Sequence, residues 1–83
     1  MIETNYKHDD DYYYDIVRIN IKKYRKLAKL TQQQLADKVG LSMNYIAKIE
    51  SKKMKKSFAI AVLGRIADAL NIDIRKLFDG VDE

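Results

Sequence analysis

The stretch that decides the fold is Thr31–Glu50, TQQQLADKVGLSMNYIAKIE, which holds one of the three glycines in the chain. A helical pattern ends at Val39, and Gly40 can adopt the left-handed conformation that closes a helix without a Cβ clash. Ser42 is a residue type that commonly caps the start of a helix. Only a short link therefore separates two helices, and so short a link makes them cross steeply.

A steep crossing needs a small residue where the helices approach and apolar anchors on the second helix. Ala36 lies one turn before the glycine and has a side chain small enough for a close approach. Ile46 and Ile49 are three residues apart, so they share one helical face. These features define a helix-turn-helix.

The flanking segments predict further helices. Residues 16–30 have the apolar period of an amphipathic helix, and most apolar residues of 57–70 fall on one face. No alternating run with a hairpin turn predicts a strand pair. We therefore expect an all-α domain of five helices over 16–30, 32–39, 43–51, 57–70 and 74–78, with Asp15, Thr31, Ser42 and Asp73 as caps and a Thr31–Gln34 capping box.

The first of these helices should separate its apolar and basic side chains. The pattern places four residues on the face toward the core, namely Val17, Ile21, Tyr24 and Ala28. It places the basic residues largely away from that face, namely Arg18, Lys22, Lys26 and Lys29. A basic amphipathic helix is therefore expected.

Charge is unevenly placed along the chain, whose formal net charge is +4. Residues 1–15 hold five acids and one lysine, a balance of −4, whereas residues 16–57 hold twelve bases and two acids, a balance of +10. The middle segment is a candidate anion-binding surface, with a solvated lysine-rich surface as the alternative. We expect an acidic, tyrosine-rich leader over 1–14, disordered or loosely docked, a domain over 15–79 and a tail over 80–83 that starts where Gly80 ends the ordered part.

Length and composition limit the class of protein. Eighty-three residues suffice for one small hydrophobic core. The chain has no cysteine, which excludes disulfides and thiolate metal sites. No apolar run reaches the roughly 18 residues of a membrane span, and the first residues lack the features of a signal peptide. We expect a soluble, cytoplasmic protein.

Nothing in the sequence favours an enzyme. His8, the one histidine, lies beside Asp9, Asp10 and Asp11. A metal-chelating cluster is one interpretation, but a solvated acidic tail is the favoured one. The serines of the domain have no histidine partner, and no glycine-rich phosphate loop is present. We expect no catalytic residue, metal or cofactor.

At the level of the whole stretch, LTQQQLADKVGLSMNYIAKIE resembles the helix-turn-helix of the phage-repressor (Cro-like, XRE) DNA-binding domains. Tyr24 and Arg25 and the closing LNIDIRKLF match the flanking helices of that family, so the resemblance covers about residues 16–78. It implies a lambda-repressor-like fold. The chain departs from the family where Lys29 and Lys52 replace glycines, where no proline precedes the fourth helix, and where the interval after Glu50 is about two residues longer.

The resemblance implies that the third helix is a recognition helix that lies in the major groove of DNA. The base-reading candidates are then Met43, Asn44, Tyr45 and Lys48. Asn44 can pair with adenine, Lys48 can donate to guanine, and Met43 or Tyr45 can contact a thymine methyl group. For Met43 and Tyr45 the alternative is packing against neighbouring helices.

Two further sets of residues follow from the same resemblance. The candidates for contact with DNA phosphates are Gln32, Ser42, Lys52, Lys53, Lys55 and Lys56. Arg25 and Glu50 occupy the positions where the family joins its first helix to the end of its third by an ion pair, so we assign them a structural role. For a single lysine, a solvated surface position remains the alternative.

The expected function is therefore sequence-specific binding of double-stranded DNA by a small, repressor-like transcription regulator. The resemblance implies a homodimer, with Ile74, Leu77 and Phe78 of the fifth helix either forming its interface or closing the core. The alternative is an antitoxin-like or adaptor module on the same fold, in which the acidic leader or the C-terminus contacts a protein partner. A further hypothesis is that the leader folds back on the basic face and competes with DNA.

Overall fold

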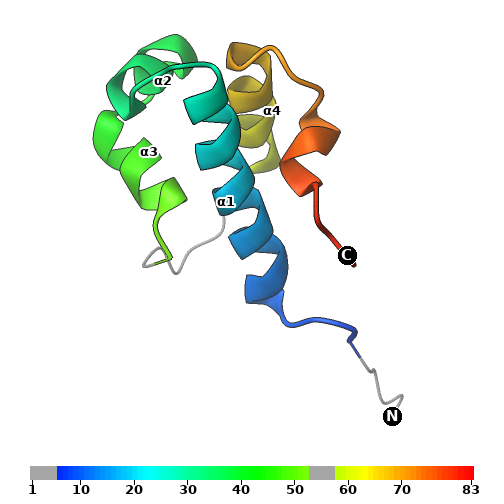
Figure 1. Ribbon diagram of the computed structural model, residues 1–83. Helices are drawn as coiled ribbons and strands as arrows, with labels where there is room; N and C mark the ends of the chain where they lie inside the picture. Colours follow the sequence, from blue (N-terminus) through cyan, green and yellow to red (C-terminus); the bar gives the residue numbers. More distant parts are fainter. Residues whose placement is uncertain (1–5, 53–57) are drawn as a thin grey trace.

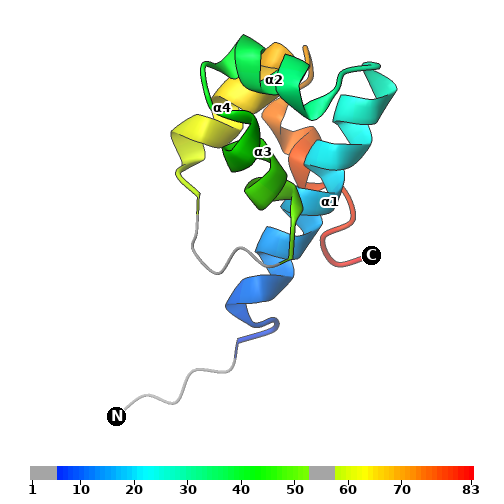
Figure 2. The same ribbon diagram turned by 90° about the vertical axis from the view of Figure 1, so that its left-hand side faces the viewer.

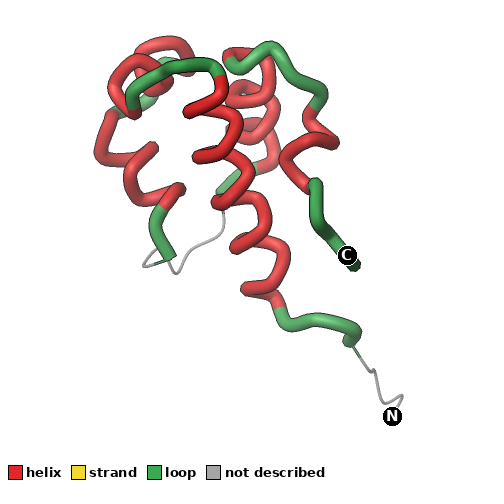
Figure 3. Tube along the Cα trace, in the orientation of Figure 1, coloured by secondary structure: helices red, strands yellow, loops and turns green. Residues whose placement is uncertain are grey.

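The computed structural model describes residues 6–52 and 58–83, and these residues form a helical domain (Figures 1 and 3). The elements are α1 (Asp10–Leu27), α2 (Gln32–Val39), α3 (Met43–Glu50), α4 (Ile60–Ala69) and a short 3₁₀ helix, η1 (Ile74–Phe78). No strand occurs in the described part of the chain. The predicted all-α fold is confirmed.

The longest helix, α1, is the element around which the others are arranged. It contacts α3 on one side and η1 on the other, while α2 packs on α3 and α4 (Figures 1 and 2). Every element contributes to the core, whose largest fully buried side chains are Ile21, Leu35, Ile46, Ile49, Ile66 and Leu77. Burial of each such side chain contributes about 1.5–3 kcal/mol, so these contacts fix how the helices sit together.

The start of α2 has the expected cap. The Thr31 hydroxyl accepts a hydrogen bond from the backbone N–H of Gln34 at 3.0 Å. The Gln34 side chain in turn accepts from the backbone N–H of Thr31 at 2.8 Å, which completes the capping box.

The turn between α2 and α3 also has the predicted geometry. Gly40 has a φ of +71°, and the N–H of Leu41 donates to the carbonyl of Ala36 at 3.0 Å. Ser42 then caps α3 by accepting from the N–H of Tyr45 at 3.1 Å. Ala36 and the anchors Ile46 and Ile49 are all fully buried. The helix-turn-helix predicted from sequence is therefore present.

The helix α1 ends at Leu27, earlier than predicted, because the chain turns at Lys29. The N–H of Lys29 donates to the Lys26 carbonyl at 2.9 Å, and that of Leu30 donates to the Arg25 carbonyl at 3.1 Å. These two bonds form a Schellman motif, which requires a left-handed residue. Lys29 fills that position with a φ of +59°.

The start of α1 was predicted incorrectly. The helix begins at Asp10 rather than residue 16, and its cap is Asp9, whose carboxylate accepts from the N–H of Tyr12 at 3.0 Å, rather than Asp15. Acidic side chains in a first turn interact favourably with the helix dipole. The run of aspartates that looked like an unstructured leader is therefore the beginning of the helix.

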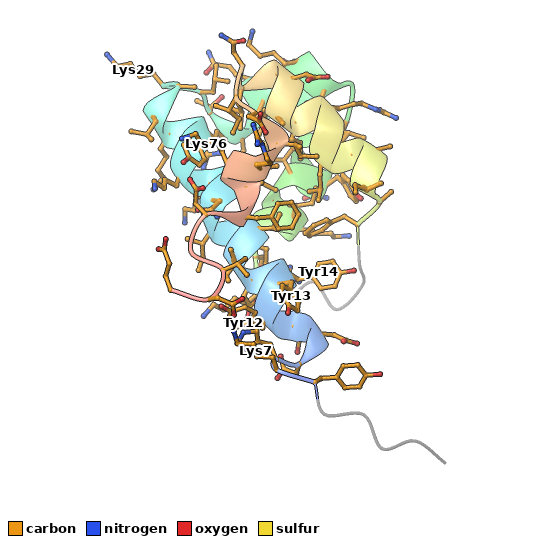
Figure 4. The ribbon with its side chains drawn as sticks, turned by 90° about the vertical axis from the view of Figure 1, so that its right-hand side faces the viewer. Lys7, Tyr12, Tyr13, Tyr14, Lys29 and Lys76 are labelled. Carbon is orange, nitrogen blue, oxygen red and sulfur yellow. The ribbon has the colours of Figure 1, made fainter. Side chains whose placement is uncertain are left out.

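The predicted end of the ordered part at Gly80 is also incorrect, because the last residues are held against the start of α1. The Asp82 carboxylate accepts from Lys7 at 3.0 Å and from His8 at 2.7 Å, and its N–H donates to the Tyr12 hydroxyl at 2.9 Å. Figure 4 shows Lys7 and Tyr12 together at this end of α1. The hydrogen bonds from His8 and Lys7 hold the pKa of Asp82 below its usual value.

These contacts correct two expectations about the leader. His8 is not a residue of a solvated tail, because its side chain is 21% exposed and its ring stacks on Tyr12 at a centroid distance of 3.7 Å. Residues 6–14 form the start of α1 and the turn before it, so for them the expected fold-back over the basic face is wrong. No group of three or more potential metal ligands occurs among the described residues.

The last two helices differ from expectation in detail. α4 begins at Ile60, after an extended N-cap at Ala59. Phe58, just before it, is buried and packs edge-on against Tyr14 at a centroid distance of 5.1 Å. Asp73 caps η1 as predicted. The Asp73 carboxylate accepts hydrogen bonds from the Arg75 side chain, which has the larger effect, and from the Arg75 backbone N–H. These bonds lower the pKa of Asp73 to about 2.

Replacing Lys29 with glycine should raise the free energy of unfolding by about 1 kcal/mol, because glycine adopts the left-handed conformation without a Cβ clash. Urea denaturation followed by circular dichroism measures the change. Lys22→Gly is the matched control, since it removes the same charge from an exposed helical position of α1, and it should lower the same free energy by about 1 kcal/mol. A loss of stability in Lys29→Gly would contradict the role assigned to Lys29.

Candidate nucleic-acid interface

The helix α3 lies on the surface with one face buried and the other open. Figure 2 shows it in front of the rest of the domain, beside α2 and α1. Ile46 and Ile49 lie on its inner face and are fully buried. Met43, Asn44 and Lys48 are exposed on its outer face. The helix therefore presents polar and apolar side chains outward from a rigid support.

Tyr45 has an intermediate position. It is half-buried and packs against the hydrophobic core, as the packing alternative predicts. Part of the Tyr45 side chain nevertheless stays accessible to solvent, so Tyr45 can pack against the core and still be a base-reading candidate. The four base-reading candidates thus come together on one helix, three of them fully on its open face.

A buried ion pair locks the end of α3 to α1. The Arg25 guanidinium donates through Nε and Nη2 to the two carboxylate oxygens of Glu50, at 2.7 and 2.9 Å. Only 9% of the Arg25 side chain and 3% of the Glu50 side chain are exposed. Arg25 also donates to the Leu30 carbonyl at 2.7 Å, so it secures the turn before α2 as well. The predicted ion pair is confirmed.

The phosphate-contact candidates are placed around the two ends of the helix-turn-helix. Gln32 is half-buried at the start of α2, and its amide donates to Glu50 Oε1 at 3.2 Å. This bond orients the Gln32 side chain. Ser42 is exposed at the start of α3, and Lys52 is exposed after its end. Lys53, Lys55 and Lys56 lie outside the described residues.

Arg18 is a residue that the sequence interpretation placed incorrectly. It was expected on the basic, outward side of its helix, but it is 5% exposed and donates through Nη1 to the Ser51 carbonyl at 2.6 Å. Its Nε lies 3.6 Å from the Asp15 carboxylate, and its guanidinium lies 5.9 Å from the centre of the Phe58 ring. The spacing of seven between Arg18 and Arg25, two helical turns, was the signal that could have placed both on the face toward α3.

Exposed charge differs between the start of α1 and the helix-turn-helix. Within residues 32–52 the exposed charges are three lysines and one aspartate, since Glu50 is buried in its pair with Arg25. Acids gather at the start of α1, where Asp82 is held by Lys7, whereas Asp79 accepts a hydrogen bond from Tyr24 in the last turn of the same helix. The helix-turn-helix is therefore one part of the described surface that suits a polyanion, and the exposed lysines of residues 22–29 form another.

The fold and this surface define a DNA-binding helix-turn-helix domain, and comparison with known proteins agrees. A helix-turn-helix family model matches residues 21–77, which is more than half of the sequence. The chain therefore belongs to this helix-turn-helix family of DNA-binding transcription regulators. No described helix is both long and apolar enough to cross a membrane.

Individual relatives carry regulatory names. The chain is 33% identical over 63 residues to the control protein C.SmaI of Serratia marcescens, covering 76% of this chain and 73% of that protein. It is 44% identical over 54 residues to the immunity repressor protein of Bacillus phage phi105, covering 65% of this chain and about a third, 36%, of the repressor. The crystal structure of SinR, the master regulator for biofilm formation, in complex with DNA matches with a TM-score of 0.68 and 27% identity, covering 76% of this chain and 98% of that one.

Replacing Glu50 with glutamine should lower the free energy of unfolding by about 3 kcal/mol, because it leaves the buried Arg25 without its counter-charge. Thermal and urea unfolding measure this change. Asp37→Asn is the matched control, since it removes a carboxylate from an exposed position of α2, and it should have no measurable effect. Similar stabilities of the two variants would show that the ion pair does not hold the domain together.

Proposed function

We propose that this DNA-binding regulator reads base edges in the major groove with the open face of α3. The observation that carries the proposal is that Met43, Asn44 and Lys48 are exposed on a helix whose opposite face is fully buried and whose end is tied to α1 by the Arg25–Glu50 pair. Preorganised side chains lose little conformational entropy on binding. Recognition helices of this class contact bases through their N-terminal residues.

Each exposed side chain has a suitable partner among the bases. The Asn44 amide can pair with N6 and N7 of adenine, and the Lys48 ammonium can donate to O6 and N7 of guanine. Met43, which is 46% exposed, can lie against the methyl group of thymine. Tyr45 can extend this apolar contact through the part of its side chain that the core leaves open.

Contacts to phosphates would come from the residues around α3. The first N–H groups of α2 are available to a phosphate oxygen, and Gln32 lies beside them with its amide oriented by Glu50. Ser42 and Lys52 stand at the two ends of α3. From the sequence, Lys53, Lys55 and Lys56 would add to the same set. That SinR matches this chain and was crystallised in complex with DNA supports this arrangement.

The alternative of a protein-interaction module is less well supported as the main function. An adaptor would expose an apolar surface on its helix-turn-helix, whereas α3 exposes Asn44 and Lys48 beside Met43. One similar structure is a complex of SinR with the SinI protein, which leaves room for a protein partner besides DNA. The acidic termini are the part of the described surface where we would place such a partner. No enzymatic activity is proposed, and a location in the cytoplasm follows from contact with DNA.

We further propose that the regulator acts as a homodimer. Dimers of this class read two half-sites about one helical turn apart, so the second copy must leave both recognition helices free. An apolar groove of about 390 Å³ meets this condition, since no residue of α2 or α3 lines it. It is lined by Asp10, Tyr13, Tyr14, Val17, Phe58, Ile60, Leu63 and Phe78.

The residues that line the groove differ in part from the dimer interface expected from sequence. Leu77 is fully buried and closes the core, which is the second of the two roles expected for it, and Ile74 is half-buried against the core. Phe78 remains a candidate at 38% exposure. It is joined there by Ile60, which is 74% exposed, and Tyr13, which is 42% exposed. A second copy that packed on these side chains would remove them from water.

DNA binding is tested by gel shifts across a salt series, with a duplex selected from random DNA and an unselected duplex. Asn44→Ala should weaken binding to the selected duplex by about tenfold or more and leave the unselected duplex unaffected. Lys52→Ala should weaken both alike and reduce the salt slope by about 1. Lys76→Ala, on the side of the domain that faces away from α3 (Figure 4), is the control and should change neither. Absence of binding by the unchanged protein at low salt would rule out the proposed function.

The dimer is tested by sedimentation equilibrium. Ile60→Asp places a charge in the groove and should weaken self-association by about tenfold or more, because a carboxylate resists burial in an apolar contact. Ile19→Asp is the matched control, since Ile19 is a 59% exposed isoleucine of α1 that does not line the groove, and it should dimerise normally. A monomeric unchanged protein, or equal loss in both variants, would exclude the groove as the interface.

A further inference from the structure

The guanidinium of Arg18 lies against the residues at both ends of the segment that joins α3 to α4. On one side Nη1 donates to the carbonyl of Ser51, the residue that ends α3, at 2.6 Å. On the other side the group lies 5.9 Å from the ring centre of Phe58, just before α4. Six residues separate Ser51 from Phe58 in sequence, yet one buried side chain of α1 contacts both. Arg18 therefore fixes where the chain leaves α3 and where it returns.

The chemistry of these contacts favours arginine. The carbonyls at the end of a helix carry partial negative charge and attract a cation, and a charge-assisted hydrogen bond to such a carbonyl is stronger than a neutral one. The flat guanidinium can also stack on an aromatic ring while its edge donates hydrogen bonds. Lysine offers a point charge without a stacking plane, so it cannot reproduce both contacts.

This chain has a specific need for such a contact. The sequence lacks the glycine and the proline that the resembled family has around the start of the segment and before the fourth helix, and its interval is about two residues longer. Those residue types restrict the backbone directly. Here Ser51 instead ends α3 in an extended conformation, with φ −98° and ψ 136°, and its carbonyl is held by Arg18.

We propose that Arg18 is a positioning residue for DNA binding, which sets the direction of the chain after the recognition helix and so places Lys52 against the DNA backbone. The inference rests on the proposed DNA-binding function. Arg18 itself is 5% exposed and lies beneath the surface, so it would act through α3 and Lys52 without touching DNA. A loss of its contacts should therefore affect all DNA sequences alike, whereas base reading by Asn44 should survive.

The experiment compares Arg18→Met, Arg18→Lys and the matched control Arg65→Met, which removes an exposed arginine from α4. Affinity for the selected and unselected duplexes is measured across a salt series, at a temperature at which circular dichroism shows each protein folded. Arg18→Met should weaken binding to both duplexes by about tenfold and lower the salt slope by about 1, with the ratio between the duplexes unchanged. Arg18→Lys should restore little of this loss, and Arg65→Met should resemble the unchanged protein.

Affinity and salt slope are readouts that a purely structural role would not move in a folded variant. A folded Arg18→Met protein with the affinity and slope of Arg65→Met would overturn the inference while leaving the proposed function intact, as would full recovery in Arg18→Lys. No DNA binding by the unchanged protein would refute both. If neither Arg18 variant folds, Phe58→Leu removes the ring beside Arg18, and Tyr14→Leu is its control, since Tyr14 packs on Phe58 and lines the same groove. Phe58→Leu should then give a smaller loss in the same direction that Tyr14→Leu does not give, and equal binding by the two variants would overturn the inference.

Discussion

The buried ion pair between Arg25 and Glu50 is the interaction on which the rest of the structure depends. It joins the last turn of α1 to the end of α3, and through the Leu30 carbonyl and the Gln32 amide it also holds the start of α2. Burying two charges is costly unless each is fully paired, so the network tolerates little change in geometry. That requirement selects one placement of α3 relative to α1, and the outer face of α3 is useful only if that placement is fixed.

A second constraint acts within the backbone. Gly40 reverses the chain in a left-handed conformation, and the full burial of Ala36 lets α2 and α3 approach closely. The ion pair then acts at the far end of α3, while the turn acts at its near end. With both ends held and two isoleucines buried between them, the helix has little freedom to rotate. The exposed face of α3 is consequently held in one orientation relative to the rest of the domain.

The helix-turn-helix could be predicted from sequence because its determinants are local. A glycine, a cap and the spacing of small and apolar residues specify the turn within about a dozen positions. The start of α1 was missed although Asp9 is a local cap, because the segment also packs against distant residues: Phe58 lies 44 positions beyond Tyr14, and Asp82 accepts from Lys7. Arg18 was missed for a related reason. A basic residue on an amphipathic helix is usually solvated, so the spacing of seven from Arg25 was passed over, and the contact with Ser51 shows what its guanidinium binds. The DNA contacts themselves depend on a molecule that the sequence does not contain.

The placement of charge connects these structural constraints to function. Acidic side chains lie in the first turn of α1, and beside them Asp82 forms an ion pair with Lys7 and a hydrogen bond with His8. At the end of α3, the carboxylate of Glu50 is withdrawn from the surface into its pair with Arg25. The same ion pair that holds α3 in place therefore leaves Asp37 as the one exposed acid beside three exposed lysines within residues 32–52. In the proposed binding mode, this local excess of positive charge favours the approach of the helix-turn-helix to the polyanion.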